Sequence, residues 1–139
     1  MDVLYSNIKI NSCNNVSVVR RAVWRGRGFA SMKIPKGNEQ RATISFDGDV
    51  IVETDTLDNI VMGLGTDHID FLKIDIEGAE AEAIHGMKET LKITKYLMIE
   101  LRPSTLWMVE EFINNLNHEI IDCVNHGAVT NFLFLNRKE

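Results

Sequence analysis

Cysteine is scarce in this 139-residue sequence, which contains only Cys13 and Cys123. Two cysteines without motif spacing provide neither a disulfide framework nor a zinc site, so a reducing, cytoplasmic setting is expected. The four histidines are scattered with no ligand spacing among them. We interpret them as surface or turn residues, and the sequence therefore predicts no metal centre built on histidine or cysteine.

Long apolar runs are also absent. No run approaches the ~18 residues of a membrane-spanning helix, and the amino terminus lacks the basic and apolar pattern of a signal peptide. The net charge of −5 argues against general nucleic-acid binding, so neither a membrane nor a nucleic acid is expected as a partner. With 45% hydrophobic and 25% charged residues, the composition is that of one ordinary globular domain, residues 1–139, long enough for a single sizeable core.

Positive charge is concentrated in residues 20–41. This segment has Glu39 as its single acid and contains the basic residues Arg20, Arg21, Arg25, Arg27, Lys33, Lys36 and Arg41. Such a run usually forms a solvated face. The alternative is contact with a phosphate or another anionic group.

Residues 69–80 are the stretch around which the rest of the chain is organised. The first part is dominated by large apolar side chains, several of them β-branched, and predicts a central sheet strand buried on both faces. Residues 78–83 are rich in helix formers and predict the start of a helix. Asp75, Glu77 and Glu80 lie at this transition from strand to helix, and the carboxyl ends of parallel strands are where open α/β sheets bind ligands. The structural alternative is that these acids cap the helix or favour its positive end.

The other segments predict a mixture of helices and strands. We expect a helix at residues 2–11, a strand at 16–19, a hairpin outside the main sheet from strands 30–34 and 42–46, a short helix after residues 50–58, a strand at 96–101 and last strands at 119–124 and 130–135. A helix after Gly78 would place one face in the core through Glu80, Ile84, Met87 and Leu91, with Gly86 as a kink or a left-handed stop. A helix after Pro103 would bury the stripe Leu106, Val109, Ile113 and Leu116, with Phe112 beside it.

One segment resembles the most characteristic part of the FkbM family of S-adenosylmethionine-dependent methyltransferases: Lys73-x-Asp75-x-Glu77-Gly78-Ala79-Glu80, followed by Ile84-His85-Gly86. Support comes from Thr56-Leu57-Asp58, in which a helix cap is the alternative role of at least one polar side chain, and from Ile99-Glu100-Leu101. The resemblance covers nearly all of this chain but only the carboxyl-terminal part of the family's domain. It implies an α/β, Rossmann-like methyltransferase sheet that is amino-terminally truncated and ends in a terminal antiparallel hairpin.

The resemblance also implies S-adenosylmethionine as the cofactor and assigns roles to residues. It places three residues near the adenine: Ala22, Val23 and Trp24. It implies that Asp75 and Glu77 are catalytic and that Glu80 and Glu100 bind the methyl acceptor. Methyl transfer from a sulfonium is an in-line displacement in which a carboxylate can accept the hydroxyl proton, and Asp75 is the candidate for this base or for orienting the acceptor. A divalent metal held by Asp75, Glu77 and Glu100 is conceivable from oxygen-ligand chemistry, although no metal is expected.

The implied activity is O-methylation of a small hydroxylated molecule or sugar. A Gly-rich turn after a buried strand and a ribose-binding acid are not found in the sequence, so we expect the chain alone to bind S-adenosylmethionine poorly and to turn over little or no acceptor. Alternative functions are a catalytically inactive association module and an anion or nucleotide binder that uses the basic segment. The loss of neighbouring strands would leave an unpaired edge at residues 69–75, which predicts a homodimer or direct pairing of this strand with residues 16–23.

Overall fold

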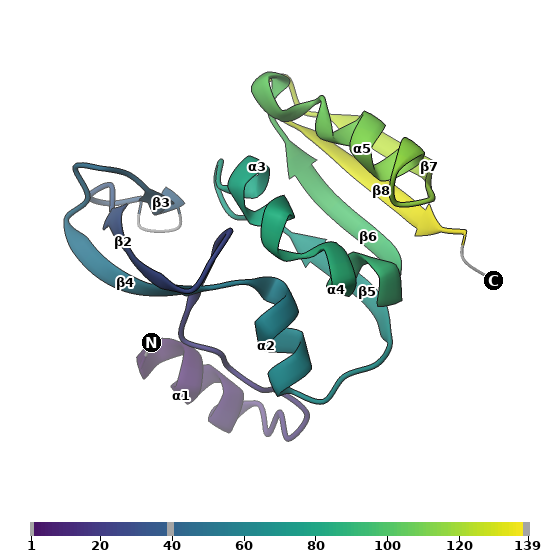
Figure 1. The fold of residues 1–139 in the computed structure, drawn as a ribbon. Coiled ribbons are helices and arrows are strands. Elements are labelled where there is room, and N and C mark those ends of the chain that lie inside the picture. Colours follow the sequence, from purple (N-terminus) through teal and green to yellow (C-terminus); the bar gives the residue numbers. More distant parts are fainter. Residues whose placement is uncertain (1, 39–40, 138–139) are drawn as a thin grey trace.

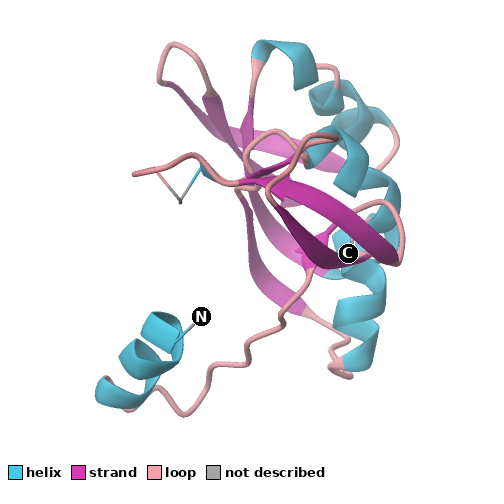
Figure 2. Cartoon of the chain, turned by 90° about the vertical axis from the view of Figure 1, so that its left-hand side faces the viewer, coloured by secondary structure: helices cyan, strands magenta, loops and turns pink. Residues whose placement is uncertain are grey.

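The computed structural model describes residues 2–38 and 41–137 and contains two four-stranded sheets with their helices (Figure 1). The predicted α/β class is confirmed at this level, but the strands divide between two sheets where we expected one main sheet with a hairpin beside it. Apart from the amino-terminal helix, the helices gather on one side of the strands (Figure 2). Within the described residues, every helix is too short or too polar to cross a membrane.

The first sheet is built from four strands in the order β1-β4-β2-β3: β1 (Ala22–Val23), β2 (Gly28–Lys33), β3 (Thr43–Ile44) and β4 (Val50–Asp55). β2 is antiparallel to β3 and β4, and β1 is parallel to β4. The predicted hairpin is therefore confirmed, and it lies outside the sheet that contains residues 69–74. β4 leads directly into α2 (Leu57–Gly63).

The predicted strand at residues 16–19 is wrong. These residues are irregular, and Val16 and Val19 are 49% and 40% exposed. No neighbouring backbone among the described residues pairs with them, and an apolar alternation without a pairing partner does not hold a strand. Pairing of residues 16–23 with residues 69–75 is also wrong, because β1 pairs with β4.

The second sheet has the order β5-β6-β8-β7 and comprises β5 (Ile69–Ile74), β6 (Thr94–Leu101), β7 (His118–Asn125) and β8 (Thr130–Asn136). β5 and β6 are parallel, whereas β8 is antiparallel to both β6 and β7. The terminal antiparallel hairpin is therefore confirmed. β5 lies at the edge, so the expected unpaired edge at this strand is confirmed for the described part of the chain.

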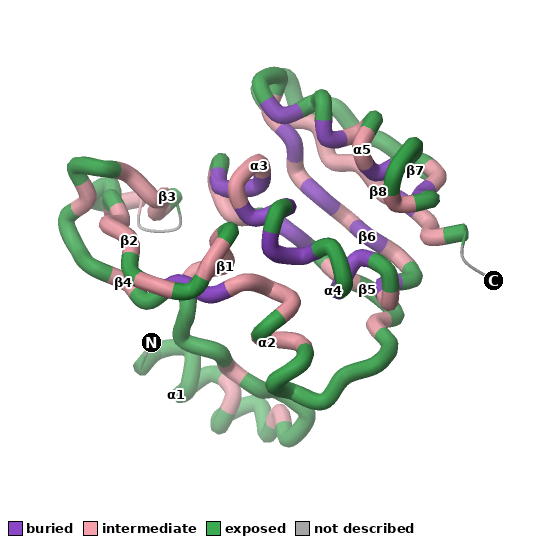
Figure 3. Tube along the Cα trace, viewed as in Figure 1, coloured by how far each residue is buried: buried purple, intermediate pink, exposed green. Residues whose placement is uncertain are grey.

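Burial of residues 69–75 on both faces is wrong. Phe71 is 52% exposed, and only one face of β5 packs into the core, through Leu72 and Ile74. The interior strands are β6 and β8, and β6 contributes three fully buried apolar residues, Leu97, Ile99 and Leu101 (Figure 3). The reason is that helices cover one face of this sheet, so an apolar side chain on the other face of an edge strand stays accessible.

The helical segment after Gly78 follows the prediction closely. It consists of α3 (Glu80–Ala83), the 3₁₀ turn η2 (Ile84–Gly86) and α4 (Lys88–Ile93), and its predicted inner face is buried at Glu80, Ile84, Met87 and Leu91. Gly86 interrupts the helix without a left-handed backbone, so the kink is confirmed and the left-handed stop is wrong. A Cβ at Gly86 would lie 2.8 Å from both the Trp24 carbonyl oxygen and Thr56 Cγ2, so the close approach of these segments requires glycine.

The helix after Pro103 is rotated from its predicted orientation. A 3₁₀ turn, η3 (Pro103–Thr105), precedes α5 (Met108–Asn114), and the tighter 3₁₀ winding changes the phase of the stripe. Met108 and Phe112 are fully buried, whereas Leu106 and Ile113 are 42% and 43% exposed. Phe112 packs against Phe134 of β8, with ring centroids 5.1 Å apart.

The amino-terminal helix α1 (Asp2–Ile10) forms as predicted but has no buried residue. Val3 and Ile10 are 74% and 79% exposed. Figure 2 shows this helix standing apart from the sheets at the end of an extended segment. The core is therefore built from β5, β6 and β8 and from the helical segments that follow β5 and β6.

Candidate functional site

A polar pocket of about 880 Å³ opens where β5 and β6 end. It is lined by residues from both sheets and from the turn between β7 and β8: Pro35, Arg41, Thr43, Asp75, Glu77, Glu100, Arg102, His126, Ala128 and Val129. Because Ile74 pairs with Ile99, the residues that follow them, Asp75 and Glu100, leave adjacent parallel strands at the same level. The structure therefore brings together Asp75, Glu77 and Glu100, three of the four acids that the sequence singles out.

Asp75 is held by a charged neighbour on its own strand. Lys73 Nζ donates a hydrogen bond to Asp75 Oδ2 at 2.7 Å. This hydrogen bond raises the pKa of Lys73, and attraction to Asp75 and then Glu100 adds to the rise. Lys73 is therefore a firmly protonated cation beside the pocket. Asp75 does not cap the following helix, which has Ala79 at its N-cap and no side-chain cap, so the capping alternative is wrong for this residue.

Glu77 sits on a constrained loop. Its backbone is left-handed, with φ of 53°, and Gly78 follows with φ of 94°. A non-glycine residue in this region costs about 1–3 kcal/mol, which the surroundings must offset. The side chain accepts a hydrogen bond from Arg102 Nη2 at 2.9 Å, and the Glu77 carbonyl accepts one from Thr43 Oγ1 at 2.9 Å. Contacts from both sheets thus fix where the Glu77 carboxylate points.

Glu80 supports this loop from behind. It is only 2% exposed and does not line the pocket, although the sequence predicts contact with an acceptor. Its Oε1 accepts hydrogen bonds from the backbone N–H groups of Ile76 at 3.3 Å and Gly78 at 3.1 Å. Glu80 is also the first residue of α3, where a negative charge is favourable. These contacts match the structural alternative.

Two of the three residues predicted to lie near the adenine line a common hollow, and the third does not. Ala22 and Val23 line a smaller hollow of about 250 Å³ that also borders Asp75 and Glu77. Trp24 is half-buried and is not part of this lining, and its backbone N–H donates to the Asp55 carbonyl at 2.9 Å. The structure therefore brings β1 next to Asp75 and Glu77, and its two residues, Ala22 and Val23, line the hollow that they share.

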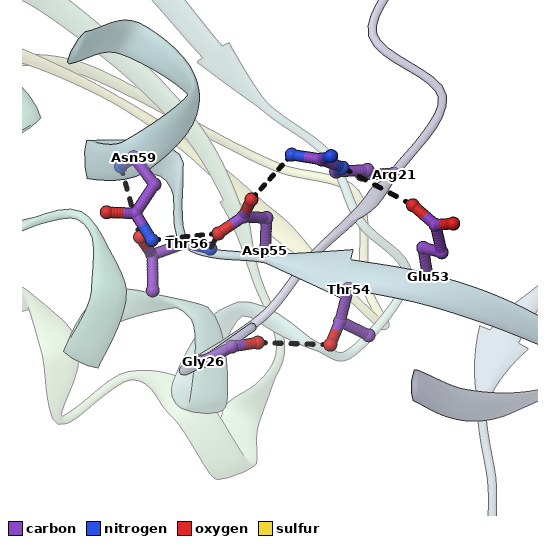
Figure 4. A network of polar contacts seen from close by, with 7 residues as sticks. All are labelled: Arg21, Gly26, Glu53, Thr54, Asp55, Thr56 and Asn59. Atoms are coloured by element: carbon purple, nitrogen blue, oxygen red, sulfur yellow. Dashed lines mark hydrogen bonds and ion pairs between the residues drawn. The ribbon is translucent and has the colours of Figure 1, made fainter. Parts of the chain in front are cut away.

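A buried carboxylate, Asp55, fixes the junction of β1, β4 and α2 (Figure 4). Its oxygens accept hydrogen bonds from Asn59 Nδ2 at 2.9 Å, the Thr56 backbone N–H at 2.9 Å and Arg21 Nη1 at 2.7 Å. The Asn59 hydrogen bond is the largest cause that lowers the pKa of Asp55, followed by the Thr56 N–H and the charges of Arg21 and Arg27. The sequence analysis did not find this cluster, because its members lie on three separate elements.

Two polar residues of the Thr56-Leu57-Asp58 signature are helix caps. Thr56 Oγ1 accepts from the Asn59 backbone N–H at 3.1 Å and begins α2. Asp58 reaches across to α4, where Oδ1 accepts from the Thr90 N–H and hydroxyl, both at 2.7 Å, and Oδ2 accepts from the Glu89 N–H at 3.3 Å. The capping alternative is therefore confirmed for this signature.

Much of the basic segment is engaged in ion pairs. Arg21, Arg25 and Lys33 each lie within 4 Å of a carboxylate, at 2.7, 3.2 and 3.5 Å. This favours the solvated face over a dedicated anion site. Arg41 is different, because it lines the polar pocket.

The pocket contains functional candidates that the sequence analysis missed, notably Arg102 and His126. Arg102 follows β6 directly, and its place two residues after Glu100 at a strand end is a usable signal. His126 comes from a distant turn and gives none. Across residues 2–38 and 41–137, no three histidine, cysteine or acidic side chains lie close enough to hold a metal ion, so Asp75, Glu77 and Glu100 do not form a metal site there.

Residues 2–134 match the family model described as the methyltransferase FkbM domain. A curated protein, the 2-O-methyltransferase NoeI of Sinorhizobium fredii (strain NBRC 101917 / NGR234), is 35% identical over 78 residues, which cover 55% of this chain and 32% of that protein. The match thus spans about a third of the relative's length. No solved structure matches the chain.

Proposed function

The chain belongs to the FkbM methyltransferase family, and from this we propose that it transfers a methyl group from S-adenosylmethionine to a hydroxyl oxygen of a small hydroxylated molecule or sugar. Family membership supports methyl transfer as the reaction. The relative is a 2-O-methyltransferase, which favours oxygen as the atom that accepts the methyl group. The donor and the acceptor class are part of the proposal.

The observation that carries the proposal is the gathering of Asp75, Glu77 and Glu100 in one pocket at the carboxyl ends of β5 and β6. Carboxylates accept hydrogen bonds from hydroxyl groups, and the guanidinium groups of Arg41 and Arg102 donate them. A polyhydroxylated acceptor offers both kinds of group, so this lining suits such a molecule better than an apolar one. The strand ends are also where α/β sheets bind ligands.

The hollow beside β1 is suited to the cofactor. Ala22 and Val23 border the smaller hollow that adjoins Asp75 and Glu77, which supports placing the adenine there with Trp24 nearby. The parallel pair β5–β6 followed by antiparallel β8 agrees with the carboxyl half of a Rossmann-like methyltransferase sheet. When bound, S-adenosylmethionine supplies an electrophilic methyl group on a sulfonium. The protein's part is to align the acceptor oxygen with that methyl and to take up the hydroxyl proton.

The test is transfer of an isotopically labelled methyl group to a defined set of acceptors. The chain is incubated with millimolar labelled S-adenosylmethionine and with methyl glucoside, methyl mannoside, methyl galactoside or glycerol, and the products are identified by mass spectrometry. Because the affinity for S-adenosylmethionine is expected to be weak, we expect a small amount of labelled ether from at least one glycoside. Glu110→Gln, on the exposed side of α5, is the matched control and should retain activity. Absence of labelled product from every acceptor would overturn the proposal.

A second candidate function is association without catalysis. Two observations favour it: β5 leaves an edge unpaired among the described residues, and α1 buries none of its side chains. Exposed strand edges are templates for pairing with another chain, so we propose a homodimer. Light scattering on the purified chain should give the mass of two copies. A monomer at all accessible concentrations would rule this association out.

We also propose the cytoplasm as the compartment. Cys13 and Cys123 are both free thiols, as expected of a protein in a reducing environment.

A further inference from the structure

The three carboxylates of the pocket differ in their hydrogen-bond and ion-pair partners. Asp75 receives the Lys73 ammonium at 2.7 Å, and Glu77 receives the Arg102 guanidinium at 2.9 Å. Glu100 makes neither a hydrogen bond nor an ion pair within 4 Å through its side chain in the described part of the chain. Its carboxylate oxygens are therefore open to a hydroxyl group in the pocket.

Building on the proposed function, we infer that Glu100 is the catalytic base that accepts the acceptor's hydroxyl proton and that Asp75 orients the acceptor. A carboxylate whose oxygen is already bonded to an ammonium has to give up part of that interaction to take a proton. Glu100 has no direct hydrogen bond or ion pair to lose among the described residues, and only the longer-range attraction of the Lys73 ammonium acts on it. Asp75, held in place by Lys73, is suited to accept a second hydrogen bond from a neighbouring hydroxyl and so to fix the acceptor's position.

The position of Glu100 fits this role. It is half-buried and lies near the end of β6, an interior strand. Glu100 pairs with Asn131 of β8, and the preceding residue, Ile99, pairs with both β5 and β8, so the backbone here is held in place. Groups on such rigid elements hold their geometry more closely than groups on loops. Glu100 and Asp75 follow a paired couple of residues on adjacent parallel strands, so an acceptor with neighbouring hydroxyls can reach both.

The other basic groups around the pocket are less suited. The pKa of Lys73 is raised, chiefly by its hydrogen bond to Asp75, so Lys73 stays protonated and cannot act as the base. His126 lines the pocket, but it is exposed and lies on the turn between β7 and β8. It is the strongest competing base, and the test therefore includes it.

The step balances without a further reactant. The acceptor oxygen forms the new O–C bond to the methyl carbon as the C–S bond breaks, and the electron pair of the C–S bond stays on sulfur, giving S-adenosylhomocysteine. The hydroxyl proton moves to a Glu100 carboxylate oxygen and then to water. The products are the methyl ether and a restored carboxylate.

The test compares Glu100→Gln, Asp75→Asn and His126→Gln in the full chain, using the most reactive methyl glycoside of the panel. S-adenosylmethionine is kept at one fixed millimolar concentration, so each kcat is an apparent value at that concentration. We expect Glu100→Gln to lower kcat about 10²- to 10⁴-fold, the range for loss of a general base, with little change in the KM for the glycoside. Its residual rate should rise with pH, because hydroxide replaces the base. Asp75→Asn should mainly raise the KM, and His126→Gln should lower kcat far less than Glu100→Gln does.

A second variant guards against a folding defect. Glu100→Ala leaves space for a small carboxylate, so added formate should restore part of its rate, a recovery that a merely structural role would not produce. A parent rate in Glu100→Gln, a comparable loss in His126→Gln or no recovery with formate would overturn the assignment while the proposed function stands. A parent chain without methyl transfer to any acceptor would overturn both.

Discussion

Replacement of Asp58 by alanine should destabilise the fold without touching the pocket. Its carboxylate caps α4 by accepting from the N–H groups of Glu89 at 3.3 Å and Thr90 at 2.7 Å, and loss of such a cap typically costs about 0.5–2 kcal/mol. The same carboxylate accepts from the Thr90 hydroxyl at 2.7 Å. Thr90 is only 1% exposed, so its hydroxyl would lose its acceptor in the interior, at about 1–3 kcal/mol.

Together these losses predict a decrease of about 2–4 kcal/mol in the free energy of unfolding for Asp58→Ala. Urea denaturation followed by far-ultraviolet circular dichroism measures it. Asp70→Ala is the control, because the Asp70 side chain is 89% exposed and its one polar contact among the described residues is with His68 at 3.2 Å, so a change within about 0.5 kcal/mol is expected. Asp58→Asn keeps an acceptor oxygen and should fall between the two. An Asp58→Ala midpoint equal to that of Asp70→Ala would refute the capping argument.

Three further predictions concern the core, the buried acid and the cofactor. Ile74→Ala and Ile84→Ala remove side chains that are 5% and 3% exposed, so each should cost about 2–5 kcal/mol, measured by denaturant midpoints. The pKa of Asp55 is lowered in the folded state, so its charged form stabilises the fold at any pH above the ordinary aspartate pKa of about 3.9. This contribution is lost as the pH falls through the folded-state pKa. The stability difference between the parent and Asp55→Asn should therefore shrink from pH 7 to pH 3, whereas a constant difference would contradict this. Calorimetry with S-adenosylmethionine should give millimolar or weaker affinity, and a micromolar dissociation constant would show that other contacts hold the cofactor.

The acids of the site were predictable because a strand end is visible in sequence. An apolar run that stops at Asp75 or Glu100 marks the edge of a sheet, and parallel strands bring such ends together. The histidine of the pocket was not predictable in the same way. His126 reaches the pocket only because β7 and β8 form a hairpin against β6, which no local pattern encodes.

The burial of β5 was mispredicted for a related reason. Phe71, Leu72 and Ile74 are all apolar, so the sequence carries no alternation to separate an inner face from an outer one. Which face is covered depends on where α3 and α4 pack. For α5, a single 3₁₀ turn before the helix was enough to move Met108 into the core and Leu106 out of it.

The hydrogen bond from Thr43 Oγ1 to the Glu77 carbonyl joins the two sheets directly at the pocket. β3, which carries Thr43, is held by its neighbours in the first sheet, whereas Glu77 follows a strand of the second, so the pocket wall exists only when both sheets are formed and docked. During folding, the acids and Arg41 can come together only after this docking. In the native state, a local opening of the short β2–β3 hairpin would release the Glu77 loop while the core around β6 stays intact, and amide hydrogen exchange would detect it as early loss of protection in β2 and β3.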